Sequence, residues 1–149
     1  MNRYMLCACC MGVFVFASAV AAQGPATTDV DARVTALIES MAKSDYAGKS
    51  AVDELVKIGK PAVEALIKAL KDERKRVRYW SAAALGRIKD ERAYEPLVAM
   101  AKSDADAFCR ATALWYLQHF ARPAVWDLAA EALKDPDVTV RGYAIRLLK

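Results

Sequence analysis

The chain has 149 residues, of which 56% are hydrophobic, and its formal net charge at pH 7 is +4. This length fits one domain that buries somewhat more than about 60% of its unfolded surface, and the charge is too small to indicate a nucleic-acid or acidic-lipid partner. Three of the four cysteines, Cys7, Cys9 and Cys10, lie close to the N-terminus. Only Cys109 remains elsewhere, so the rest of the chain has no internal disulfide to stabilise it.

The first 22 residues have the layout of a secretory signal peptide. A positive charge precedes an uncharged, mostly apolar stretch at Tyr4–Ala17, and the small residues of Ser18–Ala22 follow it. We therefore predict a signal peptide over residues 1–22, cleaved after Ala21 or Ala22, and a periplasmic or secreted protein. The uncharged run is also long enough for an uncleaved membrane anchor. A lipoprotein cleaved at Cys9 or Cys10 is a further alternative.

The remaining chain divides into a flexible lead-in, residues 23–28, and one repeat domain over residues 29–149. The first helix begins near Asp29, and its apolar residues recur at spacings of three and four, which place them on one face. Gly48 interrupts this pattern. We therefore predict that a short second helix follows Lys49, carries Val52 and Leu55 on its apolar face, and ends at Gly59.

A block then recurs about every 31 residues through the C-terminal two thirds of the chain, as Val63, Tyr94 and Val125 illustrate. A fixed period of this size is typical of stacked helical hairpins, each of which needs its neighbours to cover its apolar face. No segment alternates with period two over a useful length. The predicted fold is therefore all-α, an α–α superhelix of about three to four helical hairpins after the signal helix.

Proline and aspartate residues indicate where the later helices begin. Pro61 and Pro123 suit first helical positions, because a helix start does not need the N–H that proline lacks. Asp90 and Asp104 can cap two further helices, since an Asp carboxylate accepts hydrogen bonds from free N–H groups. Asp135 leads into the last helix. In total we predict seven or eight helices.

An Asp six residues before an Arg also recurs, and we interpret these residues as structural pairs. The planar guanidinium of each Arg can reach an Asp carboxylate in its own or the adjacent repeat, and stacking then forms a ladder of pairs. Anion binding by the arginines is the alternative, which the recurrence of an Asp with each Arg disfavours. The pairs are Asp72 and Arg78, Asp104 and Arg110, and Asp135 and Arg141.

The segment Val77–Ile88, followed by Asp90 and Leu97, resembles the HEAT repeat. It is most similar to the bacterial HEAT-like type named after phycobilin lyases, and the resemblance is strong from about Val52 to the end. The resemblance implies an α–α superhelix whose second helices line a concave side and bind partners. The family includes adaptors, chaperone-like subunits and a few enzymes.

Residues that would support catalysis are few. The metal-dependent HEAT-like hydroxylases use His–Glu pairs, but His119 is the one histidine of this sequence and aligns with a surface position. Cys109 takes a small apolar position held elsewhere by Val77 and Val140, so we interpret it as a core residue. The basic run 71–78 contains two acids and is typical of a solvated helix start. We expect no enzyme activity, cofactor, metal or nucleic-acid partner, and no membrane contact beyond the signal segment.

The strongest candidate site is an apolar stripe on the third repeat. Trp126, Ala130 and Leu133 lie on the expected solvent face, and their spacings of four and three put them on one side of a helix. Trp115 is a second unexpected aromatic residue in that repeat. Exposed apolar stripes often mark interfaces and Trp is enriched in binding hot spots, so we predict that a protein partner binds here. Local packing that covers these side chains is the alternative.

Together, these features predict an exported, non-catalytic scaffold that binds a protein partner through its concave face and this stripe. The C-terminal repeat, whose last helix has one uncovered side, is a candidate homodimer contact. The competing prediction is an accessory subunit or lyase-like enzyme that holds a cofactor or small ligand in the groove.

Overall fold

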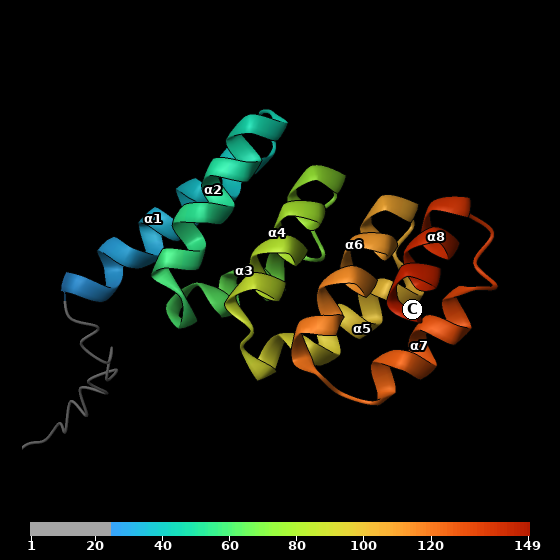
Figure 1. The fold of residues 1–149 in the computed structure, drawn as a ribbon. Helices are drawn as coiled ribbons and strands as arrows, with labels where there is room; N and C mark the ends of the chain where they lie inside the picture. The colour runs from blue at the N-terminus through green and yellow to red at the C-terminus, as the bar shows by residue number, and fades with distance from the viewer. Residues whose placement is uncertain (1–24) are drawn as a thin grey trace, which may run out of the picture.

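The computed structural model describes residues 25–149, and within that range every regular element is helical. Eight α-helices pair in chain order into four hairpins, with three short 3₁₀ segments between some of them (Figure 1). The helices are α1 (Pro25–Met41), α2 (Asp45–Ile58), α3 (Val63–Ala69), α4 (Lys75–Ile88), α5 (Tyr94–Ser103), α6 (Ala107–Leu117), α7 (Ala124–Ala132) and α8 (Val138–Leu147).

The four hairpins stack side by side in a single row (Figure 1). The second helix of each hairpin packs closely against the second helix of the next, in the order α2, α4, α6 and α8. The first helices make far fewer contacts with one another. Because closer packing on one side bends a stack toward that side, the second helices form the inner layer and the first helices the outer layer.

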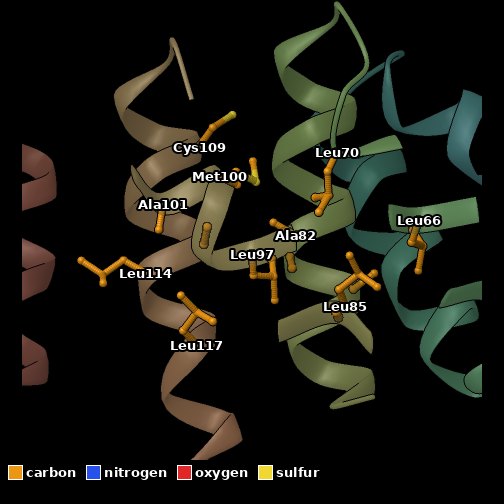
Figure 2. Close-up of a cluster of buried hydrophobic side chains, with 14 of the residues drawn as sticks. Leu66, Leu70, Ala82, Leu85, Leu97, Met100, Ala101, Cys109, Leu114 and Leu117 are labelled. Atoms are coloured by element: carbon orange, nitrogen blue, oxygen red, sulfur yellow. The ribbon is translucent and has the colours of Figure 1, made fainter. Parts of the chain in front are cut away.

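The apolar residues that recur in the sequence form the core between these two layers. Val63, Tyr94 and Val125 are all buried, and each lies at the start of its first helix. Burying one such side chain contributes about 1.5–3 kcal/mol. Figure 2 shows how leucines of successive hairpins gather in this core, among them Leu66, Leu85, Leu97 and Leu117.

Two glycines allow the second helices to approach one another closely. A Cβ atom at Gly48 would lie 2.1 Å from Nε1 of Trp80, and one at Gly86 would lie 2.3 Å from Cβ of Tyr116. Side chains at these positions would therefore overlap with their neighbours. The glycines are required where α2 meets α4 and where α4 meets α6.

Helix α2 begins at Asp45, so the prediction of a short helix that begins only after Lys49 was wrong. Gly48 lies inside the helix because its missing side chain makes room for Trp80. Ser44 caps the helix by accepting a hydrogen bond from the N–H of Ala47 at 3.1 Å. The packing against α4 outweighs the cost of a helical glycine, which is about 1 kcal/mol.

The N-terminal cap of α6 also differs from the prediction. Asp104 is the C-cap of α5. The N-cap of α6 is Asp106, whose carboxylate accepts a hydrogen bond from the N–H of Phe108 at 3.0 Å. Helix α8 is capped in the same way by Asp137. The recurring aspartates lie two residues ahead of these caps, where they are free to contact the preceding hairpin.

Helix α1 begins at Pro25, so the predicted lead-in at residues 23–28 overlaps a helix. Proline is favoured at the first position of a helix, which explains why the helix can include it. The predicted signal peptide, residues 1–22, lies outside the described residues. In the range that the structure describes, no helix is long and apolar enough to cross a membrane.

The glycine contacts predict opposite effects for two similar substitutions. We expect Gly86→Ala to lower the free energy of unfolding by about 1–3 kcal/mol, because the new methyl group overlaps with Tyr116. Gly142→Ala is the matched control: a Cβ atom there has no neighbour within 4 Å, so the change should stabilise α8 by about 0.5–1 kcal/mol. Urea denaturation followed by circular dichroism measures both. Equal effects of the two changes would contradict the close contact between α4 and α6.

Candidate interaction site

The recurring arginines join successive hairpins. Arg78 of α4 donates from Nε and Nη2 to the two carboxylate oxygens of Asp104, at 2.8 and 2.9 Å. Arg110 of α6 makes the same pair of contacts with Asp135, both at 2.8 Å. These four side chains are only 6–14% exposed, so water screens the pairs weakly.

Each arginine also holds the turn before its own helix. Nη1 of Arg78 donates to the backbone carbonyls of Asp72 and Glu73, at 2.9 and 3.0 Å. Arg110 and Arg141 make equivalent contacts with carbonyls in their own turns. The donors of Arg78 and Arg110 are therefore used within the fold, which favours the structural interpretation over anion binding at these two residues.

The ladder of pairs changes at both ends of the described stack. Gly48 stands in α2 where Arg78 stands in α4, so Asp72 has no arginine from the preceding hairpin. Asp72 instead binds Arg74, whose guanidinium also reaches Glu39 of α1 at 2.8 Å. At the other end, Arg141 contacts only backbone carbonyls, those of Asp135 and Pro136.

The ion pairs shift the pKa values of their carboxylates downward. Hydrogen bonds from Arg110 lower the pKa of Asp135, and hydrogen bonds from Arg74 lower that of Asp72. In the turn before α5, Arg92 lowers the pKa of Asp90 to about 2. Such carboxylates stay ionised in the folded protein at pH values where they are already protonated in the unfolded chain.

The predicted apolar stripe lies on the surface of α7 and its C-cap. Trp126 is 52% exposed and Leu133 is 40% exposed, and Ala130 between them is exposed as well. Trp115 lies apart from this stripe, because it belongs to α6 in the inner layer. Its ring is half-buried and meets the ring of Tyr143 edge-on at 5.7 Å.

A second aromatic surface, which sequence reasoning did not single out, lies on the inner layer. The rings of Tyr79 and Trp80 meet edge-on at 4.7 Å. Burial raises the pKa of the Tyr79 hydroxyl above its ordinary value. Of the ten aromatic residues between 25 and 149, seven belong to second helices: Tyr46, Tyr79, Trp80, Phe108, Trp115, Tyr116 and Tyr143. This unequal distribution was visible in the sequence.

A groove of about 440 Å³ opens between the N-terminal ends of α2, α4 and α6. We call it the inner groove. Tyr79, Trp80 and Phe108 give it an apolar lining, and Phe108 is 61% exposed. Its rim carries two exposed ion pairs, Arg76 with Asp45 at 3.4 Å and Lys75 with Asp106 at 3.5 Å. The charges at the rim therefore neutralise one another, and the groove suits an apolar side chain.

Cys109 and His119, the two residues considered for catalysis, lie in surroundings typical of a core cysteine and a surface histidine. Cys109 is buried, and burial raises its pKa to about 12, so it is a thiol at neutral pH. Its Sγ–H faces the carbonyl of Lys75 at 3.5 Å. His119 is exposed in the middle of the 3₁₀ segment Gln118–Phe120, which follows α6. Between residues 25 and 149, no group of three or more His, Cys, Asp or Glu residues could hold a metal ion.

Stacked hairpins with an inner and an outer helical layer define an α-solenoid, a class of protein that presents extended binding surfaces. The family model for HEAT repeats matches residues 30–118, which is more than half of the chain. The chain therefore belongs to the HEAT repeat family. The match includes most of the first three hairpins and ends before α7 and α8. A search of curated proteins found no match to this sequence.

The lowered pKa values predict how stability depends on pH. The pairing of Asp135 with Arg110 contributes stability in full above the unfolded pKa of about 3.9, and this contribution is lost as pH falls through the lower folded pKa. We expect the free energy of unfolding to decrease below about pH 4, and less steeply in Asp135→Asn, which has no such carboxylate to protonate. Urea denaturation at a series of pH values measures this. The matched control is Asp127→Asn, an exposed residue of α7. Identical pH profiles for Asp135→Asn and the unchanged protein would contradict the role given to this pair.

Proposed function

We propose that this chain is an exported, non-catalytic scaffold that binds a protein partner through the inner groove. Membership of the HEAT repeat family supports a scaffold, because such repeats commonly mediate protein interactions. Export to the periplasm or beyond rests on the composition of residues 1–22, with a positive charge, an apolar stretch and small residues in that order.

The exposure of Phe108 is the main reason to place the binding site in the inner groove. Phe108 projects from α6 beside Tyr79 and Trp80 of α4 and remains largely exposed, although it is one of the largest apolar side chains in the chain. Aromatic residues in a desolvated pocket dominate the energy of many protein interfaces. The partner would insert an apolar side chain among these three rings, and the ion pairs at the rim would form the polar edge of the interface.

The stripe of Trp126, Ala130 and Leu133 is a second surface for a protein partner. Its exposure supports this use, whereas the inner groove also offers a concave site. A scaffold with two separate apolar surfaces can hold two partners at once. Substitutions at each surface distinguish their roles.

A small ligand in the inner groove is the alternative function. The volume of about 440 Å³ lies within the range of small-molecule sites. An accessory subunit or an enzyme similar to the phycobilin lyases, to which the sequence has a resemblance, would use the groove in this way. The fold alone does not decide between these functions, because one scaffold serves many of them.

The test is recovery of a partner from envelope extract by the mature protein and by surface variants. We expect Phe108→Glu to reduce recovery of the specific protein at least about tenfold, because it places a charge among apolar rings. Tyr46→Glu is the matched control, because Tyr46 is an exposed aromatic residue of the inner layer that does not line the groove. The double variant Trp126→Glu with Leu133→Lys tests the stripe in the same assay.

Two outcomes would overturn the proposal. Full recovery of the partner by Phe108→Glu, with helicity intact by circular dichroism, would show that the inner groove does not bind it. Native mass spectrometry of the purified protein provides the second measurement. A stoichiometric small molecule that Phe108→Glu releases would favour the ligand-binding alternative.

A further inference from the structure

The apolar stripe of α7 lies at positions that are exposed throughout the row of hairpins. Glu64 and Lys71 of the second hairpin take the places of Trp126 and Leu133, and both are exposed. The equivalent residues of α5 are exposed as well. In these two hairpins the face stays open although a further hairpin follows. The exposure of the stripe therefore results from its outward direction, and the unusual feature of α7 is that apolar residues occupy it.

Two charged residues border the stripe on one side of α7. Asp127 and Lys134 are seven residues apart, about two turns, so they lie on the same side of Ala130. Trp126 and Leu133 have the same spacing and lie on the other side. Asp127 and Lys134 are both exposed, and neither takes part in an ion pair within the described part of the chain. Their charges are therefore available to another molecule.

The order of these residues is complementary to itself. When two α7 helices lie antiparallel with Ala130 of each at the centre, Asp127 of either copy faces Lys134 of the other. On the other side of the centre, Trp126 faces Leu133, and this contact also occurs twice. The small side chain of Ala130 lets the helices approach closely. In a parallel pair each residue would meet its own copy, and Asp127 would repel Asp127.

We propose that the stripe of α7 binds a second copy of this chain through an antiparallel pair of α7 helices. This rests on the proposed use of the stripe as a protein-binding surface and names its occupant. Asp127 and Lys134 form two ion pairs that fix the orientation, and Trp126 covers Leu133 and excludes water. The contact joins outer layers, so the inner layer of each copy stays uncovered (Figure 1). The dimer thus presents two inner grooves and binds a partner with repeated segments by avidity.

Sedimentation equilibrium of the mature protein at increasing concentration measures the dimer. We expect a monomer–dimer equilibrium, and Ala130→Glu should raise its dissociation constant at least about tenfold, because it places a charge at the centre of the contact. The matched control is Ala99→Glu, since Ala99 holds the same position in α5 and is exposed. An unchanged protein that stays monomeric up to about 1 mM would overturn the proposal, as would equal effects of the two changes.

Exchanging the charges tests the antiparallel orientation. Asp127→Lys and Lys134→Asp should each raise the dissociation constant by about tenfold, because both ion pairs become repulsive. A mixture of the two variants should regain the original affinity, since each chain then offers the charge that the other lacks. A mixture that associates no more tightly than the separate variants would contradict the antiparallel pair. In dilute protein the monomer predominates, so Asp127→Asn remains a control for the pH dependence of stability.

The dimer and the inner groove are tested independently. Phe108→Glu should leave the dissociation constant of the dimer unchanged, because Phe108 lines the inner groove and lies apart from α7. A dimer that Phe108→Glu dissociates and Ala130→Glu does not would place the contact in the inner groove and overturn the proposal. A different protein recovered through the stripe of a chain that remains monomeric would overturn it as well. Circular dichroism verifies that each variant remains helical.

Discussion

The contact between an arginine of one hairpin and an aspartate of the next sets the register of the stack. Apolar faces attract one another without direction, so they would tolerate small shifts between neighbouring hairpins. Arg78 removes this freedom because its guanidinium binds two carbonyls of its own turn and both carboxylate oxygens of Asp104. A shift of either hairpin would break the bidentate geometry. Arg110 repeats the arrangement with Asp135, which makes the spacing of the last three hairpins uniform.

The first hairpin joins the stack by a different interaction, and this difference shapes the inner groove. Gly48 replaces the ladder arginine in α2, and the indole of Trp80 packs against it. Trp80 is thereby fixed in position and supplies one wall of the inner groove. Gly86 acts in a similar way between α4 and α6, where it receives Tyr116. The close approach that glycine allows therefore positions aromatic rings on the inner layer, where a partner can contact them.

The sequence was sufficient to predict the repeats, because the spacing of apolar residues indicates which side chains face the core. The burial of Val63, Tyr94 and Val125 confirms the 31-residue period, and the all-helical architecture follows from it. The start of α2 could not be predicted, since Gly48 is unfavourable in an isolated helix and only the contact with Trp80 explains it. The inner groove was missed for a related reason: Phe108 and Tyr79 belong to different repeats and become neighbours only in the stack. The stripe at Trp126 was accessible to sequence reasoning because one helix carries all of it.

The pairing of charges on the inner layer bears on which kind of molecule the proposed site in the inner groove could accept. Arg76 and Lys75 at the inner groove have acidic neighbours, and Arg87 further along α4 binds Asp53 of α2 at 2.7 Å. A polyanion would have to displace these carboxylates, and exposed pairs leave little net potential to attract it. Aromatic rings between neutralised charges instead favour a partner that is recognised by shape and apolar contact.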